Sequence, residues 1–451
     1  MRPHRDARPP VRIVHLGLGG FFRAHQAWYT GAAPDAAEWG IAAFTGRSRT
    51  LADQLSEQDG LYTLVVRGPE RDEMALQTAL SDARAGTDLD AWRDYVARPE
   101  VAVITLTVTE AGYRRHRDGG LDLDDPDVRA DLDALRRGGP TSTAPGRLVA
   151  GLAARRSAGA GPVAVVSCDN LPGNGEVTAR VVHDLAKSAD PALSDWIAES
   201  VAFVTTMVDR ITPRTTSEDV QAVAARTGQQ DAVPVVTEPF SEWLLSGDFP
   251  AGRPAWDAAG ARFVDDITPH ETRKLLMLNG GHSLLAYAGS ARGHETIADA
   301  MADPLCRAWL DRWWDEASRY VPLPAPELTE YRAALAERFT NPRIRHRLVQ
   351  IAADGSQKVP IRLLTVLRGE RGAGRMPEGA VRMLAAWIGH LRGVGAPIDD
   401  AGAGPYRERA GSARDVIALL APDLAGDTEL AEAVDDAVRR DAQPPEGQHR
   451  P

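Results

Sequence analysis

The sequence predicts an α/β fold, with a doubly wound, mostly parallel sheet in the N-terminal part and a mostly α-helical C-terminal part. Three observations support this prediction. Short runs rich in β-branched residues alternate with helical patterns up to about residue 265, as in sheets that are covered by helices on both faces. The first of these runs ends in a glycine-rich turn. From residue 266 onward the patterns are helical, with no convincing strand.

The first predicted strand, residues 11–16, leads into the glycine turn and then into a helical pattern through Tyr29. Glycines at a strand–turn–helix junction let the backbone approach a pyrophosphate, which rests on the helix N-terminus. The G-x-G-x-x-G pattern is incomplete because Phe22 stands at its last position, so a plain tight turn is the alternative. The candidate cofactor-binding residues are Gly17, Gly19, Gly20 and Phe21.

The glycine turn and the strand alternation together indicate a Rossmann-type domain. A chain of 451 residues is too long for a typical single domain. We therefore expect a dinucleotide-binding domain over residues 1–265, a helical substrate-binding and catalytic domain over residues 266–445, and a tail over residues 446–451. Loops are expected over residues 138–145 and 395–405, which are rich in glycine and proline.

The second predicted strand, residues 40–44, bears on the choice of cofactor. This strand of a Rossmann domain commonly ends in an acidic residue that binds the ribose diol of NAD. Here it is followed by a loop that contains Arg47 and Arg49. Arginines at this place suit the 2′-phosphate of NADP, and a solvated basic loop is the alternative.

Further strands are predicted over residues 62–66, 101–108, 163–166 and 201–204. The last two are followed by polar residues, Asn170 and Asp209, at the strand ends where such sheets carry their chemistry. Asn170 is a candidate donor to an oxyanion, and Asp209 a candidate partner that orders a catalytic lysine. The alternatives are an Asx-turn or helix N-cap for Asn170 and an ion pair near Arg210 for Asp209.

The helical part contains one polar cluster within an apolar stretch. On an α-helix at about 100° per residue, Glu271, His282 and Asn279 lie about 60°, 80° and 140° from Lys274, so that all four can face one pocket. The apolar residues 275–278 suggest desolvation of the lysine, which favours its neutral form and suits a general base. The alternative is a lysine with its stem on an apolar face and its head in water, followed by a helix stop at Asn-Gly-Gly.

Residues 343–360 form a second polar segment, with a glycine turn before Lys358. Such residues suit a pocket for an anionic or polyhydroxylated ligand, and Lys358 and Arg347 are the candidate substrate-binding residues. A solvated basic helix face followed by a capped turn is the alternative.

The composition excludes several classes of function. The net charge of −11 argues against nucleic-acid binding. No apolar run reaches the length of a membrane span, and the N-terminus lacks the apolar core of a signal peptide, so we expect a cytoplasmic protein without membrane association. The two cysteines, Cys168 and Cys306, cannot form a disulfide framework or a thiolate zinc site, and no metal is expected.

The motifs occur in an order that resembles the mannitol dehydrogenase family of polyol-specific long-chain dehydrogenases, which includes mannitol 2-dehydrogenase and fructuronate reductase. The resemblance runs through nearly the whole chain. It is carried by residues 13–25, 106–110, 167–175, 207–213, 238–240, 274–283 and 354–358.

The resemblance implies an NAD(P)-dependent enzyme that interconverts a sugar alcohol or aldonate and its ketose without a metal. It implies that Lys274 is the general base and that Asn170 and Asn279 bind the substrate oxygen. His282 is expected to position the substrate, Asp209 and Glu271 to support the lysine and proton passage, and Lys358 to lie at the substrate site. NAD is the expected cofactor on family frequency, with NADP as the alternative.

Two residues depart from the family pattern, since Phe22 stands where many relatives have histidine and Gly281 where serine is common. The segment from His346 to Lys358 is more similar to the hexuronate-reducing branch, which acts on fructuronate and mannonate, than to mannitol enzymes. Two other readings remain open from sequence: a 6-phosphogluconate-like or hydroxyacid dehydrogenase, and a non-catalytic nucleotide-binding protein.

Overall fold

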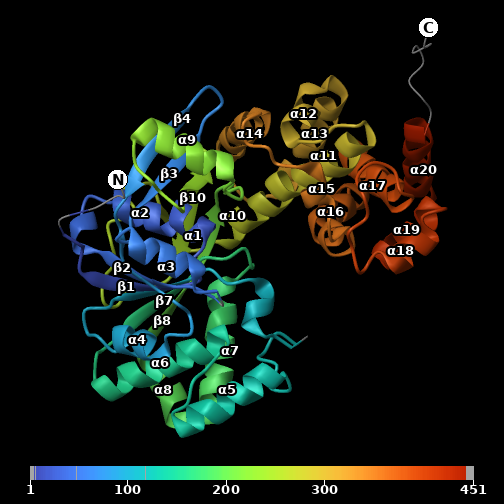
Figure 1. Ribbon diagram of the computed structural model, residues 1–451. Coiled ribbons are helices and arrows are strands. Elements are labelled where there is room, and N and C mark those ends of the chain that lie inside the picture. Colours follow the sequence, from blue (N-terminus) through green and yellow to red (C-terminus); the bar gives the residue numbers. More distant parts are fainter. Residues whose placement is uncertain (1–4, 6, 47, 117, 443–451) are drawn as a thin grey trace. The chain divides into compact units, whose positions relative to one another are not determined.

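The computed structural model describes residues 5, 7–46, 48–116 and 118–442. The chain divides into two compact units, Met1–Ile267 and Thr268–Pro451 (Figure 1). The predicted tail over residues 446–451 and the candidate cofactor residue Arg47 lie outside the described residues.

Unit 1 is built on an eight-stranded sheet in the order β11-β10-β8-β7-β6-β1-β2-β5. The six strands from β8 to β5 are parallel to one another, in the order of a Rossmann sheet. Strand β10 adds antiparallel to β8, and β11 adds parallel to β10. The strands are β1 (Val11–Leu16), β2 (Gly40–Phe44), β5 (Leu80–Arg84), β6 (Val103–Leu106), β7 (Val163–Ser167), β8 (Val201–Asp209), β10 (Glu242–Ser246) and β11 (Arg262–Phe263).

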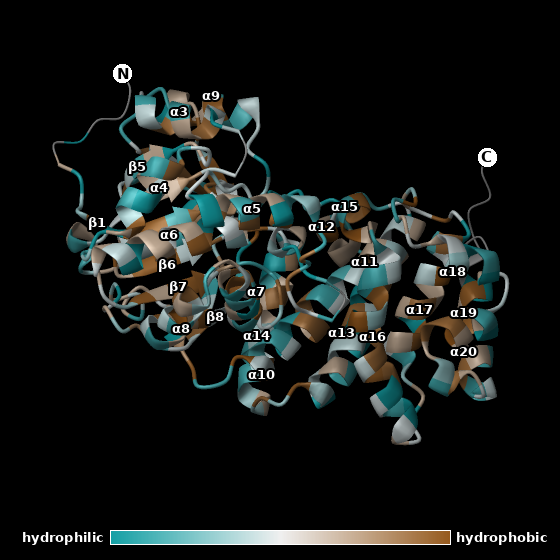
Figure 2. Ribbon diagram, turned by 90° about the horizontal axis from the view of Figure 1, so that it is seen from below, coloured by the Kyte–Doolittle hydropathy of each residue, from teal (hydrophilic) through white to brown (hydrophobic). Residues whose placement is uncertain are grey.

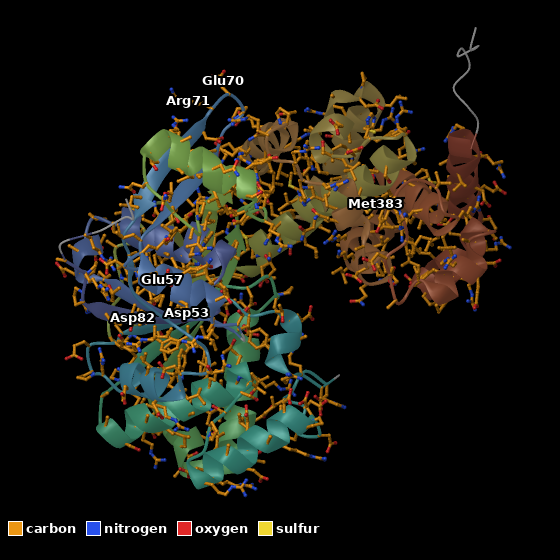
Figure 3. The ribbon with its side chains drawn as sticks, in the orientation of Figure 1. Asp53, Glu57, Glu70, Arg71, Asp82 and Met383 are labelled. Carbon is orange, nitrogen blue, oxygen red and sulfur yellow. The ribbon has the colours of Figure 1, made fainter. Side chains whose placement is uncertain are left out.

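The predicted fold class is confirmed, but one strand was assigned to the wrong sheet. Residues 62–66 lie in β3 (Tyr62–Arg67), which belongs to a separate three-stranded sheet. There β3 pairs antiparallel with β4 (Asp72–Gln77) and parallel with β9 (Val235–Thr237). A short hairpin joins β3 to β4, with Glu70 and Arg71 at its tip (Figure 3). An apolar run predicts a strand but not its pairing partner.

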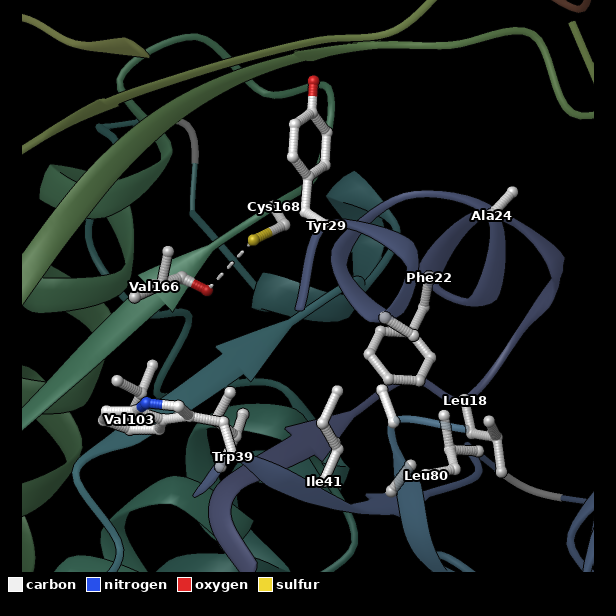
Figure 4. Close-up of a cluster of buried hydrophobic side chains, with 14 of the residues drawn as sticks. Leu18, Phe22, Ala24, Tyr29, Trp39, Ile41, Leu80, Val103, Val166 and Cys168 are labelled. Carbon is white, nitrogen blue, oxygen red and sulfur yellow. Dashed lines mark hydrogen bonds between the residues drawn. The ribbon is translucent and has the colours of Figure 1, made fainter. Parts of the chain in front are cut away.

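The sheet of unit 1 has an apolar core on each face, because successive side chains of a strand point to opposite sides. Ile13, Ile41 and Val103 belong to one core, and their neighbours Val14 and Ala42 belong to the other. Figure 4 shows the first core, in which Phe22 and Tyr29 pack over the strands and the Cys168 thiol donates to the Val166 carbonyl at 3.6 Å. Helices cover both faces (Figure 1).

The helices of unit 1 are α1 (Gly20–Ala24), α2 (Gln26–Ala32), η1 (Ala36–Glu38), α3 (Thr50–Glu57), α4 (Leu89–Val96), η2 (Glu110–Tyr113), α5 (Pro126–Arg137), α6 (Ala144–Ala158), α7 (Asn174–Ala189), α8 (Pro191–Ser200) and α9 (Ser217–Thr227). The loop predicted over residues 138–145 joins α5 to α6 but is two residues shorter, because Ala144 and Pro145 begin α6. Its Gly138 ends α5 in the left-handed conformation that glycine favours.

The described part of unit 2 contains helices and no named strand, as predicted. Its core surrounds α17, whose residues are nearly all buried and which packs against α11, α13 and α20. Most helices carry both polar and apolar residues (Figure 2), which is typical of helices with one face in a core. The helical elements are α10 (Thr268–Arg273), η3 (Lys274–Asn279), α11 (Gly280–Ala291), α12 (Ile297–Ala302), α13 (Pro304–Ala317), η4 (Ser318–Tyr320), α14 (Ala325–Thr340), α15 (Leu348–Ala352), α16 (Gly355–Gly372), α17 (Glu378–Leu391), α18 (Gly404–Arg409), α19 (Ala413–Leu420), η5 (Pro422–Leu424) and α20 (Thr428–Ala442).

Among the helices of the described residues, none is both long enough and apolar enough to cross a membrane.

Candidate active site

The three glycines of the turn after β1 have different structural roles. Gly17 has a positive φ of 115°, and a Cβ at this position would overlap the Thr107 carbonyl at the end of β6. Gly17 is therefore required by the backbone itself. A Cβ at Gly19 would meet only the Gly17 carbonyl at 3.5 Å, and one at Gly20 only the Thr212 methyl at 3.7 Å. These two glycines leave open space where a ligand can approach the backbone.

Phe22, at the position of the missing third glycine, is completely buried and stacks on His15 of β1. Their ring centroids lie 3.5 Å apart with an interplanar angle of 8°. The two ring nitrogens of His15 are held by the hydroxyls of Thr105 and Thr107. Burial lowers the pKa of His15 to about 3, so the ring is neutral. A glycine at this position of the turn normally allows the helix to pack closely on the strand. Here Phe22 fits instead because its ring lies flat on the imidazole of His15. The neighbouring Phe21 is half-buried and stacks on His25.

A cavity of about 530 Å³ lies at the carboxyl ends of β1, β2 and β6. Gly17, Gly46 and Thr107 line it, as does Arg147 of α6. The Arg147 guanidinium donates to the Gly46 carbonyl at 3.3 Å, and burial lowers its pKa. Arg147 was not predicted from the sequence, because it lies 101 residues from the loop whose carbonyl it binds.

In the basic loop after β2, Arg49 has an acidic partner within the protein. The Arg49 Nε lies 2.8 Å from the carboxylate of Asp53, which projects from α3 (Figure 3). Both side chains are largely exposed. Arg49 is therefore already paired with an acid on its own helix.

Asn170 and Asp209 lie at the carboxyl ends of the neighbouring strands β7 and β8. Asn170 is exposed, and Asp209 is the last residue of β8 and is buried. The turn after β7 is closed by Asp169, whose carboxylate accepts from Leu171 N at 3.2 Å and from the Tyr113 hydroxyl. Burial raises the pKa of Asp169 to about 6. Asp169 therefore makes an Asx-turn directly before Asn170.

The carboxamide of Asn174, a residue to which the sequence assigned no role, joins the ends of β7 and β8. Its Nδ2 donates to the carbonyls of Asp169 and Thr206 at 3.1 and 2.9 Å, and its Oδ1 accepts from Thr206 N at 2.9 Å. Arg210, next to Asp209, donates to the carbonyls of Ala24 and Glu238. Asn174 therefore fixes the distance between the two polar strand ends.

The segment around Lys274 is not a regular α-helix, which corrects the angles calculated from sequence. It is a π-helix, η3, between α10 and α11. A π turn has hydrogen bonds from i to i+5 and holds more residues than an α turn. Asn279, five residues after Lys274, therefore returns closer to the lysine's side than an α-helix would place it. Lys274 and Asn279 are half-buried, as is Glu271.

The apolar residues that follow Lys274 are in part more buried than the lysine itself. Leu276, Met277 and Leu278 are buried, whereas Lys274 and Leu275 are half-buried. The desolvation of the lysine amine expected from the apolar sequence stays a prediction. Proximity along a helix is not proximity in space, because successive residues point in different directions.

Two buried tryptophans of α13 hold the π turn. The indole N–H of Trp313 donates to the Leu276 carbonyl at 2.9 Å, and that of Trp314 donates to the Met277 carbonyl at 3.0 Å. A Cβ at Gly280 would lie 2.8 Å from the Trp313 indole nitrogen, and one at Gly281 would lie 3.3 Å from that of Trp314.

Gly280 and Gly281 are therefore needed for close packing and do not stop the helix, so the alternative of a helix stop at Asn-Gly-Gly is wrong. The helix continues to Ala291. Gly281, which departs from the family pattern, is one of the two positions that admit an indole.

His282 is buried in a ring cluster of unit 2. It stacks on Phe339, with centroids 4.5 Å apart, and meets His346 edge-on at 4.9 Å. Burial, and then the charges of His346, Arg338 and Arg362, lower the pKa of His282 well below its ordinary value. The imidazole is neutral, and its Nε2 has no hydrogen-bond partner within the described residues. Such a nitrogen is suited to a ligand hydroxyl.

The second polar segment begins the helix α16. Gly355, its first residue, is required for packing, since a Cβ there would lie 2.6 Å from the Tyr287 hydroxyl and 2.7 Å from the Trp387 indole nitrogen. Lys358 donates to the Ala353 carbonyl at 2.7 Å, and burial lowers its pKa. Arg347 is exposed at the N-cap of α15.

One group of potential metal ligands occurs among the described residues: His294, Asp303 and Cys306. The Asp303 carboxylate already accepts from the Arg292 guanidinium and from His294. Burial raises the pKa of Cys306 to about 12, so its sulfur is a thiol. A neutral thiol and a carboxylate that is already paired with a guanidinium make a poor cation site.

Comparison with known proteins identifies the family. The mannitol dehydrogenase Rossmann domain matches residues 11–258, and the mannitol dehydrogenase C-terminal domain matches residues 266–434. The chain belongs to the mannitol dehydrogenase family. The resemblance seen in the sequence motifs is therefore confirmed, and with it the class of oxidoreductases that act on polyols and related sugars.

Relatives within the family differ in substrate. The D-mannonate oxidoreductase of Escherichia coli (strain K12) is 40% identical over 407 residues, which cover 87% of this chain and 82% of the relative. Pseudomonas fluorescens mannitol 2-dehydrogenase, solved as a ternary complex with NAD and D-mannitol, is 34% identical with a TM-score of 0.79, and the match covers 97% of this chain and 91% of that chain. A D-sorbitol dehydrogenase solved in substrate-free form is 29% identical with a TM-score of 0.88, covering 97% and 93%.

Proposed function

We propose that this protein is an NAD(P)-dependent dehydrogenase that interconverts a secondary alcohol of a sugar alcohol or aldonate and the corresponding ketone. The observation that carries the proposal is the π turn, which brings Lys274 and Asn279 to one side of a helix, after Glu271 and before the neutral His282. A lysine, a carboxamide and an imidazole on one element supply a base and two hydrogen-bonding groups for a hydroxyl.

The glycine turn of unit 1 fits a dinucleotide. Gly19 and Gly20 leave open space above the backbone, and the cavity at the ends of β1, β2 and β6 adjoins Gly17. Gly17, Gly19, Gly20 and Phe21 would hold the cofactor, and Arg47 remains a candidate contact. Bound NAD would accept a hydride from the carbon that bears the hydroxyl. NAD is favoured because a relative binds it, and NADP is the alternative.

The chain's own groups act on the substrate oxygen. Lys274 in its neutral form takes the hydroxyl proton, and Asn170 and Asn279 donate hydrogen bonds to the oxygen as negative charge develops on it. His282 donates to or accepts from a substrate hydroxyl, depending on its tautomer. Asp209 and Glu271 support Lys274 and carry its proton away. No step requires a metal.

The proposed substrate pair is either D-mannonate and D-fructuronate or D-mannitol and D-fructose. Both pairs interconvert a secondary alcohol and a ketone, but only the compounds of the first pair carry a carboxylate. Lys358 and Arg347 are the proposed substrate-binding residues. A cytoplasmic location and the absence of nucleic-acid partners remain predictions from composition.

Initial rates with purified protein test the proposal. The substrates are D-mannonate and D-mannitol for oxidation and D-fructuronate and D-fructose for reduction, each with the NAD and NADP forms of the cofactor. Lys274→Ala is expected to lower kcat by about 10²- to 10⁴-fold, the contribution typical of a general base, and Lys187→Ala, an exposed lysine of α7, is the control. Oxidation by the wild type is expected to fall at low pH, because protonated Lys274 cannot accept a proton. A rate that is independent of pH below neutrality would contradict this role.

A further inference from the structure

Arg362 of α16 is a cation whose role is not explained by the proposed mechanism. Its Nη1 donates to the Ser283 hydroxyl at 2.8 Å and to the Asn279 carbonyl at 3.4 Å. Its Nε is enclosed without a hydrogen-bond partner. Its Nη2 makes no hydrogen bond within the described residues. The guanidinium therefore touches the backbone of the π turn while most of its donors are unused.

No acid neutralises this guanidinium. Among the described residues Arg362 forms no ion pair. Burial lowers its pKa to about 10, and the Tyr287 hydroxyl is the one group that acts in the opposite direction. A partly buried cation is costly without an opposite charge. Arg155, by contrast, is completely buried and donates to five backbone carbonyls.

A second cation lies one helical turn away. Lys358 precedes Arg362 by four residues on α16, and residues at this spacing are neighbours on a helix surface. The pKa of Lys358 is lowered by burial and then by Arg362. Asp354 and Asp400 act on Lys358 in the opposite direction, but the Asp400 carboxylate is held by the backbone and hydroxyl of Ser356. Lys358 thus has acidic neighbours, whereas Arg362, which contacts the Asn279 carbonyl, has none among the groups that act on it.

We propose that Arg362 binds the carboxylate of an acidic sugar and so makes this protein an aldonate dehydrogenase that discriminates against neutral polyols. The inference rests on the proposed function, because it assigns the substrate class of the same site. The Nη2 group of Arg362 carries two N–H donors without a partner among the described residues, and a charge-assisted hydrogen bond from a guanidinium N–H to a carboxylate oxygen is stronger than a neutral one. The substrate's negative charge would supply the partner that Arg362 lacks. Arg362 is a specificity-determining residue here and takes no part in proton transfer.

The exposed Arg347 is less suited to this role. Exposed charge pairs are screened by water and contribute little binding free energy, whereas a partly desolvated guanidinium contributes more. Arg362 also donates to the backbone carbonyl of Asn279. The guanidinium therefore lies next to the residue whose carboxamide is proposed to bind the substrate oxygen.

The test compares three compounds: D-mannonate, its neutral amide D-mannonamide, and D-mannitol. Wild-type protein is expected to oxidise D-mannonate with a kcat/KM at least about tenfold above that of the amide, since a hydrogen bond to a charged group is lost. This measurement needs no variant. Arg362→Gln is expected to lower kcat/KM for D-mannonate about 10- to 100-fold, mainly through KM, and to lower the ratio of mannonate to mannitol activity. Arg362→Lys is expected to recover part of that ratio.

Arg368→Gln is the matched control, because Arg368 lies on the same helix but pairs with Asp423 at the surface. It is expected to leave the mannonate-to-mannitol ratio unchanged. A wild type that oxidises mannitol or the amide as well as mannonate would overturn the assignment of Arg362 while the proposed function stands. An equal loss of both activities in Arg362→Gln would also overturn it, since that result indicates a structural role. If none of the three compounds is oxidised with NAD or NADP, the proposed function fails and this inference with it.

Discussion

Replacing Trp313 by phenylalanine is expected to weaken the π turn. The Trp313 side chain is completely buried, and its indole N–H donates to the Leu276 carbonyl at 2.9 Å. Phenylalanine keeps most of the apolar ring but removes the donor. The Leu276 carbonyl lies within a continuous helical segment, so the substitution removes one hydrogen bond of a buried group, which costs about 1 kcal/mol, and lost packing adds about 1 kcal/mol. The expected loss is therefore about 2 kcal/mol in the free energy of unfolding.

Urea unfolding measures the stability, and steady-state rates measure the effect on the turn. If the freed carbonyl lets the π turn relax, Lys274 and Asn279 move relative to each other, and kcat is expected to fall more than KM rises. The control is Trp309→Phe, a half-exposed tryptophan of the same helix, whose ring lies under the Arg382 guanidinium at 3.7 Å. A Trp313→Phe protein within about 0.5 kcal/mol of the wild type would refute the reasoning, as would an equal loss in Trp309→Phe.

Two further predictions concern unit 1. Gly19→Ala is expected to leave the unfolding free energy nearly unchanged, since its Cβ meets only the Gly17 carbonyl at 3.5 Å, but to weaken NADH binding at least about tenfold by filling the space for the pyrophosphate. Fluorescence titration measures this, and unchanged affinity would argue against a dinucleotide at the glycine turn. The pKa of His15 is about 3 in the folded protein and about 6.5 when unfolded, so its contribution to stability is lost as the pH falls below about 6.5. Relative to a His15→Gln variant, the wild type is expected to lose about 2 kcal/mol between pH 7 and pH 5; urea unfolding at both pH values checks this, and a constant difference would contradict a buried neutral His15.

The parallel sheet could be predicted because its central strands are buried on both faces. Residues 163–167 of β7 are entirely buried and apolar except for Ser167, which makes the strand visible without any knowledge of its partners. Two of the strands that were missed have a mixed sequence. The edge strand β5 reads Leu-Ser-Asp-Ala-Arg, and β4 is largely exposed. Polar residues among the apolar ones make such a pattern close to that of a loop. The buried strand β9, Val-Val-Thr, has only three residues, which is too short for a periodic pattern.

The candidate site residues could be named from sequence, but their geometry could not. The motif that contains Lys274 is compatible with an α-helix at every position, and the π turn depends on the two indoles of α13, which are more than thirty residues away in the chain. The pair Gly280-Gly281 was the available signal, and a helix end was the one interpretation considered for it, as an alternative. Paired glycines inside an apolar run also indicate a place where bulky side chains approach the backbone. Two consecutive tryptophans, Trp313 and Trp314, supply those side chains, one for each glycine.

The sequence also did not indicate which arginine lies at the proposed site. The sequence drew attention to residues 343–347 because three arginines lie close together there, yet Arg345 and Arg347 are exposed. Arg362 stands alone in its segment and is the arginine that reaches the π turn. Several charged residues close together in a sequence indicate a solvent-exposed segment. A charge that binds a ligand, by contrast, is typically half-buried and has no ion-pair partner within the protein. That combination is a property of packing, so the residue that we expect to determine substrate class became visible only when α16 and α11 were seen side by side in unit 2.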